Sequence, residues 1–482
     1  MIDVAIVGGG PVGMLLAAEL ALRGVVPVVF ERLAVPTGES KAGTLHARTA
    51  QSLARRGLLD QVGRSSYGSL RFHFSGMFGL DLGAVATDGP SLVASPQAWA
   101  EQVFARRANE LGAVVRRGQE VTGLVRHADH VALTIGGEQV RARYVVGADG
   151  ARSAVRRAAG IPFTGTGARV AALSGDVRLH DPYGLPGGYV RTPRGWILAW
   201  INPHGHSRVT TYDFTAPHAD RAAPVTLAEL RAAAERIAGV PVPMSEPRSL
   251  SRYGDAALQA ETYRDGRVLL AGDAAHVHFP WGGQGLNTGL EDAMNLGWKL
   301  AAQVLGEAPD GLLDSYQAER HPVAARVLWN VRAQTALADP DPSVGPLREL
   351  FAELMALPQV NEYLSGMISG MDTVYDVGLR GAGWMAPDLV VKTAGGEASV
   401  AGLLADGRPL LLDLGERDDL VAAVSGWPVR VVSGRAELPP ELDGIEALLV
   451  RPDGYVAWST RSGDRRLGEA LARWFRAVTP GI

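Results

Sequence analysis

Three short segments of the sequence combine glycines and carboxylates in patterns suited to holding a nucleotide. The first is Gly8-Gly9-Gly10-Pro11-Val12-Gly13, which lies between a β-branched apolar run and a run rich in Ala and Leu. Glycines let backbone approach a pyrophosphate, and a helix that starts there supplies N–H groups and partial positive charge. Glu31 ends the next apolar run and can accept hydrogen bonds from ribose hydroxyls. These features together predict a dinucleotide site.

The other two segments favour FAD over NAD as the resident nucleotide. An acidic residue at position 31 already argues against a 2′-phosphate, and so against NADP in this site. In Gly272-Asp273-Ala274-Ala275-His276, Asp273 follows an apolar run and can bind a polyol hydroxyl. In Pro280-Trp281-Gly282-Gly283-Gln284-Gly285-Leu286-Asn287, the glycines free backbone N–H groups at the start of a helix for an electron-rich ring edge.

The elements that must position these segments alternate between strand and helix. Apolar periodicity predicts a strand–turn–helix–strand unit over 4–30, a helix over 98–111 and strands at 113–115, 131–135, 143–146 and 267–271. Between about 168 and 255 the pattern changes to short alternating segments, which favours an antiparallel sheet. Long helices follow over 289–305 and from 313 past 330. A fresh α/β pattern begins near 382, with strands at 409–414, 429–432 and 446–450 and a helix over 466–476.

Composition limits the classes of function. The chain has 482 residues, a formal net charge of -4 and 20% charged residues without a long run of one sign, so neither a nucleic-acid partner nor a membrane is expected. It has no cysteine, which excludes disulfides, thiol redox chemistry and a cysteinyl flavin link. The first apolar stretch has no basic region before it and is soon interrupted by Gly and Pro. We therefore expect a cytoplasmic protein that is a monomer or a homodimer.

The ordered motifs resemble those of a known family. Gly8-x-Gly10-x-x-Gly13, Tyr144-Val145-Val146-Gly147-Ala148-Asp149-Gly150-x-x-Ser153 and Gly272-Asp273-Ala274-Ala275-His276 occur in the order and spacing of the three fingerprints of the single-component (class A) FAD-dependent aromatic hydroxylases. The whole chain resembles the branch that contains the aromatic polyketide (angucycline and anthracycline) hydroxylases and rifampicin monooxygenase.

This resemblance implies an α/β fold of three domains. A Rossmann-like FAD-binding domain, similar to that of para-hydroxybenzoate hydroxylase, would comprise 1–69, 91–167 and 259–375. An inserted antiparallel-sheet domain of 70–90 and 168–258 would bind the substrate. The C-terminal domain, 376–482, would be thioredoxin-like but, lacking cysteines, unable to exchange disulfides.

The resemblance also implies roles for individual residues. Asp273 would hold the ribityl chain of non-covalent FAD, and Asp149 and Gly150 would serve FAD and a transient NADPH or NADH. The flavin-face loop would comprise Pro280, Trp281, Gly282 and Gly283, with no acid or base assigned. The remaining expected cofactor contacts are Gly8, Gly10, Pro11, Val12, Gly13, Glu31, Arg32, Lys41, Arg48, Gln97, Val121, Gly272, Gly285, Leu286 and Asn287.

The implied reaction is hydroxylation of a polycyclic aromatic substrate, such as a phenol or quinone of polyketide type, by O2 through a flavin C4a-hydroperoxide. Three alternatives stay open: Baeyer–Villiger or ring-opening oxygenation, antibiotic inactivation, and a flavoprotein that binds ligand without oxygenating it. Mass spectrometry with labelled O2 separates the oxygenation products. Intact motifs argue against the last alternative.

Several single residues have a structural as well as a functional interpretation. His46, His73, His276 and His278 are candidates for flavin or substrate contacts, although a histidine among apolar residues is more often structural. The spacing of His276 and His278 comes without a third ligand, so no metal is expected. An apolar group of Phe72, Phe74, Met77 and Phe78 either lines a cavity or belongs to the core, and Trp281 either shapes the cavity or packs beside it.

Overall fold

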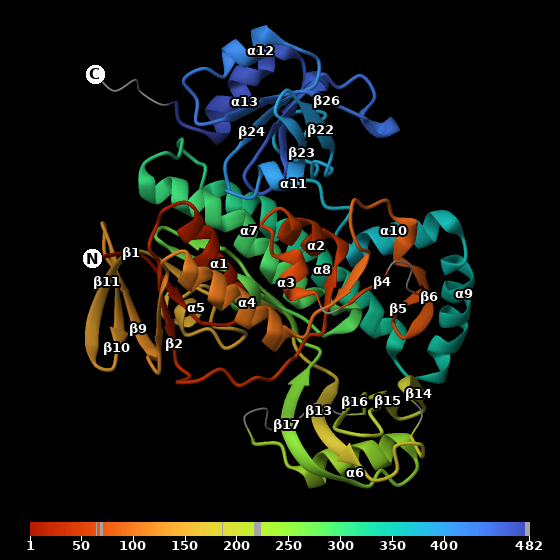
Figure 1. Cartoon of the computed structure of the whole chain (residues 1–482). Coiled ribbons are helices and arrows are strands. Elements are labelled where there is room, and N and C mark those ends of the chain that lie inside the picture. Colours follow the sequence, from red (N-terminus) through yellow and green to blue (C-terminus); the bar gives the residue numbers. More distant parts are fainter. Residues whose placement is uncertain (64, 68–70, 186, 216–222, 478–482) are drawn as a thin grey trace.

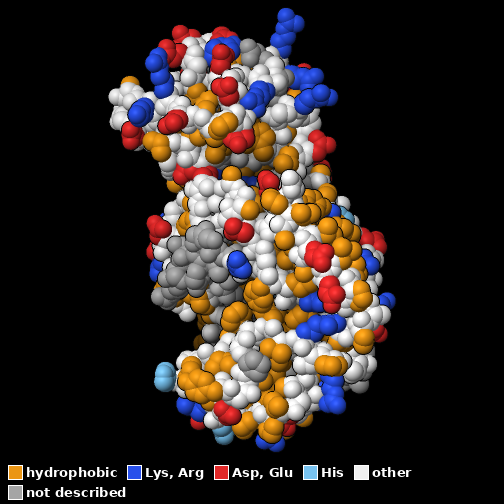
Figure 2. Space-filling model, turned by 90° about the vertical axis from the view of Figure 1, so that its right-hand side faces the viewer, with side chains coloured by type: hydrophobic (Ala, Val, Ile, Leu, Met, Phe, Trp, Pro, Cys, Tyr) orange, Lys and Arg blue, Asp and Glu red, His pale blue; other side chains and the backbone are white. Residues whose placement is uncertain are grey.

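The chain forms three stacked tiers in the computed structural model (Figure 1), which describes residues 1–482 except 64, 68–70, 186, 216–222 and 478–482. The central tier contains the N-terminus and the long helices. An inserted sheet lies on one side of it and the C-terminal residues lie on the other, and the tiers remain distinguishable in the space-filling view (Figure 2). The class is α/β with mixed sheets.

The central sheet has the order β19-β20-β11-β1-β2-β8, and its β20, β11, β1, β2 and β8 run parallel. Helices cover it, so that the apolar run of β1 is buried on both faces. The strands are β1 (Ile2–Val7), β2 (Val28–Glu31), β8 (Val114–Arg117), β9 (Val121–Arg126), β10 (Val131–Ile135), β11 (Glu138–Gly147), β19 (Arg264–Asp265) and β20 (Val268–Leu270). The helices of this tier are α1 (Pro11–Leu22), α2 (Ala47–Ala54), α3 (Leu59–Val62), α4 (Gln97–Glu110), α5 (Ala154–Ala158), α7 (Gln284–Leu305) and α8 (Asp314–Ala338).

The inserted tier is an antiparallel sheet of order β14-β15-β16-β13-β17. Helix α6 covers one face, where Leu230 and Ile237 are buried, and it was not predicted from the sequence. The opposite face packs Trp196 and Tyr212 against the central tier. The elements are β13 (Ala171–Leu179), β14 (Gly188–Thr192), β15 (Gly195–Trp200), β16 (Ser207–Asp213), α6 (Leu227–Ala238) and β17 (Met244–Gly254).

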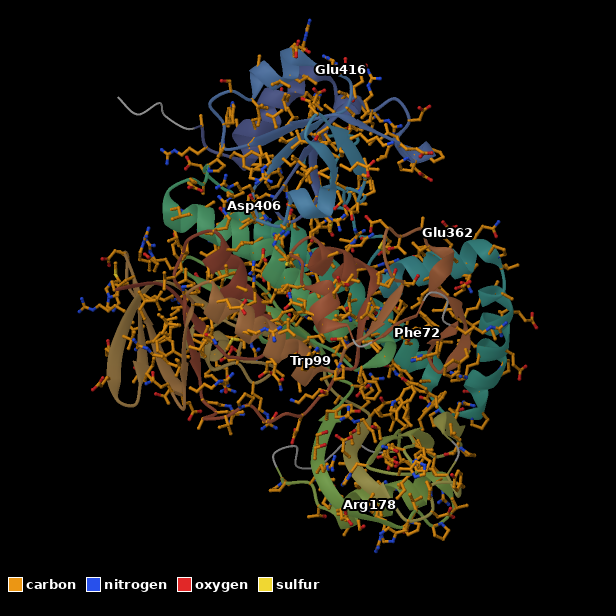
Figure 3. All side chains as sticks on the ribbon, viewed as in Figure 1. Phe72, Trp99, Arg178, Glu362, Asp406 and Glu416 are labelled. Atoms are coloured by element: carbon orange, nitrogen blue, oxygen red, sulfur yellow. The ribbon has the colours of Figure 1, made fainter. Side chains whose placement is uncertain are left out.

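Smaller elements connect the first two tiers. A hairpin of β5 and β6 contacts α9 and α10, and Phe72 on this hairpin lies near the boundary with the inserted sheet (Figure 3). These elements are β3 (Thr44–His46), β4 (Ser65–Tyr67), β5 (Arg71–Phe74), β6 (Met77–Asp81), β7 (Leu92–Ala94), β12 (Phe163–Thr166), β18 (Ala257–Ala260), β21 (His276–Val277), α9 (Gly345–Met355) and α10 (Pro358–Ser369).

The C-terminal tier has its own apolar core around a sheet of order β25-β24-β27-β28. Its elements are β22 (Val390–Thr393), β23 (Gly396–Ser399), α11 (Val400–Leu403), β24 (Leu410–Asp413), α12 (Asp418–Ala423), β25 (Arg430–Ser433), β26 (Arg435–Ala436), β27 (Ala447–Val450), β28 (Val456–Ser459) and α13 (Leu467–Trp474).

A buried ionic network fastens this tier to the central one. Arg451, in the turn between β27 and β28, donates from Nη1 and Nη2 to Glu319 of α8 at 2.6 and 2.9 Å, and from Nε to Asp453 at 3.0 Å. Lys299 of α7 donates to the same Glu319 carboxylate at 2.8 Å. All four side chains are almost fully buried.

The predicted elements agree with the structure apart from their ends. The largest differences are at two starts: α7 begins at Gln284 and not at 289, and β11 begins at Glu138 and not at 143. The glycines at 285 and 289 have weak helix propensity, which is why the sequence did not predict the first turn of α7. Among the described residues, none of the helices combines the length and the apolar character needed to cross a membrane.

Candidate active site

The glycine loop between β1 and α1 closes tightly on itself and leaves one side open. A Cβ at Gly13 would lie 2.1 Å from the Gly8 carbonyl oxygen, and one at Gly8 would lie 2.3 Å from that of Ala148. A Cβ at Gly10 would meet nothing within 4 Å. Two glycines therefore allow the turn to form, and the third leaves backbone accessible at the N-terminus of a helix, as binding of a phosphate requires.

Glu31 lies beside this loop at the end of β2. One carboxylate oxygen accepts from Gly9 N at 2.7 Å and the other from Leu33 N at 2.8 Å. Each oxygen keeps a second lone pair, so the side chain can brace the loop and still accept from a ribose.

The loop over 280–287 is joined to β3 by three side-chain hydrogen bonds. Asn287 accepts from His46 N at 2.8 Å and donates to the carbonyls of Thr44 at 3.2 Å and Gly283 at 3.0 Å. His46 Nε2 lies 2.8 Å from the Gly282 carbonyl oxygen. Gly282 and Gly283 have φ of 75° and 65°, a left-handed conformation that favours glycine. The first turn of α7 is thus held beside β3.

Asp292 of α7 fixes the turn that carries Asp273. Its Oδ2 accepts from Gly272 N at 3.0 Å and from His276 Nε2 at 2.7 Å, and its Oδ1 accepts from Arg320 at 2.8 Å. Burial opposes ionisation, but Arg320 and His276 outweigh it and lower the pKa of Asp292. His276 therefore has a structural role here, and Asp273 is left exposed at the end of β20.

An aromatic cluster lies where the inserted sheet meets the 280–287 loop. Trp281 is 1% exposed, and its ring centroid lies 5.4 Å from that of Tyr212 and 5.6 Å from that of Trp196. The ring centroids of His73 and Tyr189 each lie 6.0 Å from that of Trp281. We call these five residues the aromatic cluster.

Some buried polar atoms without partners lie beside the 280–287 loop or the glycine loop. In the described part of the chain, His46 Nδ1, His278 Nε2, Trp281 Nε1 and Asp149 Oδ1 are buried and lack a hydrogen bond. Buried polar groups are normally satisfied, so such a group of unpaired atoms indicates a ligand with polar edges. Together with the open Gly10 backbone, these atoms fit FAD.

The other residues expected to bind cofactor differ in their exposure and in the elements that carry them. Lys41 and Arg32 are exposed, Val121 is buried at the start of β9, and Gln97 begins α4 half-buried. Asp149 accepts from the N–H of Ala154, the first residue of α5, at 2.6 Å. Near the glycine loop lie Pro11 and Val12, and Gly150 follows β11. The start of α7 is flanked by Pro280, Gly285 and Leu286.

The Arg48 guanidinium has several partners within the protein. Its guanidinium donates to the carbonyls of Gly370 at 3.2 Å and Met371 at 3.0 Å and to Gln51 Oε1 at 2.9 Å. These partners hold the side chain against the segment after α10, so a flavin contact by Arg48 stays a prediction.

Comparison with known proteins identifies the family of this chain. Residues 1–331 match the family model "FAD binding domain", and residues 380–477 match "Aromatic-ring hydroxylase, C-terminal". The chain belongs to the FAD-dependent aromatic-ring hydroxylases. It is a flavoprotein monooxygenase whose cofactor is FAD, and NAD(P)H is the typical reductant of this family.

Its relatives span several activities. A 12-dehydrotetracycline 5-monooxygenase/anhydrotetracycline 6-monooxygenase of Streptomyces rimosus subsp. rimosus is 42% identical over 98% of both chains. A rifampicin monooxygenase of Streptomyces venezuelae is 41% identical over 100% of both. The solved structure of a Diels-Alderase from pyrroindomycin biosynthesis has a TM-score of 0.87 and 40% identity, covering 99% of this chain and 100% of that one.

Sequence reasoning missed the tyrosines of the inserted sheet. Tyr189, Tyr212 and Tyr253 lie on three strands, and burial raises the pKa of each hydroxyl, for Tyr253 to about 12. They therefore stay neutral donors at physiological pH. The alternation of apolar and polar residues in 188–213 was the available signal, but it did not indicate which face of the sheet would meet the 280–287 loop.

Burial of His46 predicts a pH-dependent stability. Desolvation lowers its pKa from 6.5 to about 4, so the unfolded state takes up a proton first as pH falls. The contribution of neutral His46 to the free energy of unfolding should be fully present above pH 6.5. It should fall between about pH 6.5 and 4, by up to ~3 kcal/mol. Urea unfolding across this range, at saturating FAD, should show a shallower fall for His46→Gln than for wild type. Parallel curves would refute the prediction.

Proposed function

We propose that this monooxygenase hydroxylates a polycyclic aromatic compound of polyketide type, bound beside the aromatic cluster where the inserted sheet meets the 280–287 loop. The observation that carries this proposal is the meeting of Tyr189, Tyr212 and Trp281 from two tiers beside the unpaired atoms of the cofactor site. Flat aromatic side chains favour a flat aromatic ligand, because offset and edge contacts add to simple burial.

The residues of the protein would act by holding the substrate and excluding water. FAD, when bound, supplies the oxygen-transfer chemistry. The indole N–H of Trp281 has no partner in the described residues and can donate to a quinone or ketone oxygen. The neutral phenols of Tyr189 and Tyr253 offer further donors on the sheet. The N-terminus of α7 favours negative charge at the ring edge above it.

Substrate-dependent oxygen consumption tests this proposal. Purified FAD-loaded protein should consume NAD(P)H and O2 faster when given tetracyclic or angular polycyclic phenols and quinones. Labelled O2 followed by mass spectrometry should place one oxygen atom on a ring carbon. If no compound in such a panel increases consumption, the proposal fails.

Two of the similar proteins support alternative outcomes. Rifampicin monooxygenase favours inactivation of an antibiotic, and the Diels-Alderase favours ligand conversion without oxygen transfer. Label found in a lactone or ring-opened product would indicate the Baeyer–Villiger alternative. Conversion of a ligand under anaerobic conditions without NAD(P)H would indicate the Diels-Alderase type of activity.

Trp281→Phe should weaken substrate binding selectively. The change keeps an aromatic ring but removes the unpaired N–H, so KM for a quinone or ketone substrate should rise about tenfold while kcat changes less. Trp458→Phe, in the C-terminal tier and outside the aromatic cluster, is the matched control, because its N–H already donates to the Gly463 carbonyl at 3.1 Å. That variant should lose stability and keep its KM. Equal steady-state effects in the two variants would contradict this role of Trp281.

We also infer the division of the chain into domains. The central and inserted tiers support an FAD-binding domain of 1–69, 91–167 and 259–375 with a substrate domain of 70–90 and 168–258, although residues 68–70 at one boundary lie outside the described part. Parallel pairing of β24 with β25 and antiparallel pairing of β24, β27 and β28 support a thioredoxin-like domain in 376–482.

A further inference from the structure

A separate cavity of about 320 Å³ lies where α2, α7 and α8 meet the turn that follows β27. Its lining contains no residue of the glycine loop, of the inserted sheet or of the aromatic cluster. Of the residues expected to contact the cofactor, only Arg48 and Asn287 reach it. The lining includes Thr288, Glu291, Val323, Val327, Met367 and Tyr455.

Most polar groups around this cavity are already satisfied by the protein. Gln284 donates to the Met367 carbonyl at 3.0 Å, and Thr288 donates to the Gln284 carbonyl at 2.9 Å. Arg48 is held by backbone carbonyls and Gln51, and Arg320 is held by Asp292. A ligand therefore has few protein groups with which to form new hydrogen bonds.

Two lining groups are exceptions among the described residues. The Tyr455 hydroxyl is buried and has no partner. Glu291 Oε2 accepts from Ser52 Oγ at 3.1 Å, but Glu291 Oε1 is buried and has no partner. Glu291 is only 7% exposed. An unpaired buried carboxylate oxygen is costly, and a ligand that donates a hydrogen bond to it would remove that cost.

Charge and apolar lining narrow the class of ligand. Arg48 and Arg320 both act electrostatically on Glu291, so an added ammonium group would be repelled by two cations. Burial nevertheless raises the pKa of Glu291 to about 7 against the effect of these arginines, so a neutral donor suits it better than an ion. Val323, Val327 and Met367 supply an apolar wall for the body of such a ligand.

We propose that this cavity binds a small neutral phenol, whose hydroxyl donates to Glu291 Oε1 and whose ring lies against Val323, Val327 and Met367. The site is distinct from the substrate region at Trp281 and does not depend on the proposed function. Glu291 and Thr288 belong to α7, which begins directly after the flavin-face loop, so an occupant would contact the helix that follows this loop.

A matched pair of probes tests this site on the FAD-loaded protein. 2-Naphthol has the donor and 2-methoxynaphthalene lacks it. A crystal soaked with 2-naphthol should show the hydroxyl within hydrogen-bonding distance of Glu291, and calorimetry should show at least tenfold weaker binding of the ether to this site.

Two variants distinguish a hydrogen-bonding role from a packing role. Glu291→Leu should weaken 2-naphthol binding about tenfold, whereas Glu291→Gln keeps an acceptor oxygen and should retain it within about threefold. The soak of the wild-type crystal remains decisive if the leucine variant does not fold. Three results would each overturn the proposal. They are 2-naphthol bound at the aromatic cluster alone, the flavin ring found in this cavity, and equal binding of the two probes. The oxygen-consumption assay is independent of all these results.

Discussion

Gly10→Ala is expected to lower the affinity for FAD about 100-fold, or ~2.7 kcal/mol, while leaving the fold intact. Gly10 has φ -77° and ψ -177°, which any residue adopts, and its added Cβ would meet no protein atom within 4 Å. The methyl group would instead occupy the space in which the pyrophosphate must approach the loop. Loss of entropy in the unfolded chain should even stabilise the FAD-free protein slightly.

Two further glycine variants make this result specific. Gly13→Ala should damage the fold itself, since its Cβ would lie 2.1 Å from the Gly8 carbonyl oxygen. Gly468→Ala, whose Cβ also meets nothing within 4 Å, should change neither stability nor FAD affinity by much. Thermal unfolding and fluorescence titration with FAD separate the three. Unchanged FAD binding in Gly10→Ala would place the pyrophosphate elsewhere.

The parts of the site that the sequence predicted are those formed by neighbouring residues. The glycine loop, Glu31 and the loop over 280–287 each follow from a strand, a turn and a helix start that are contiguous or separated by one helix. Local steric and hydrogen-bonding rules are enough to predict such segments, because the partners are close along the chain.

The parts that the sequence did not predict depend on distant partners. Arg48 bonds to the carbonyls of Gly370 and Met371, more than 300 residues away, and His276 pairs with Asp292 on α7. The aromatic cluster requires the inserted sheet to present one face to Trp281. Periodicity shows that a strand has two faces, but which face meets another tier is decided by tertiary packing.

Arg451→Met is expected to cost the largest share of stability, roughly 3–5 kcal/mol, because among the described residues it leaves the buried carboxylate of Glu319 paired with Lys299 alone and that of Asp453 without an ion pair. Burial alone would raise the pKa of Glu319, but Arg451 and Lys299 outweigh it and lower that pKa to about 2. In the wild type, the contribution of ionised Glu319 to the free energy of unfolding is therefore fully present above its unfolded pKa of 4.5, and it is lost as the pH falls toward 2.

The part of the molecule that is destabilised distinguishes this buried ion pair from an exposed one. Arg451 belongs to the C-terminal tier and Glu319 to α8, so the variant should also loosen the docking of residues 380–477, which proteolysis would detect as earlier cleavage near the junction. Arg435→Met removes a pair with Glu416 whose arginine side chain is 80% exposed, and it should cost less than about 1 kcal/mol. Similar losses from both variants would mean that the buried network does not hold the tiers together. Adding Glu319→Met to Arg451→Met should restore part of the lost stability, because the uncompensated charge and not the missing contact is the larger cost.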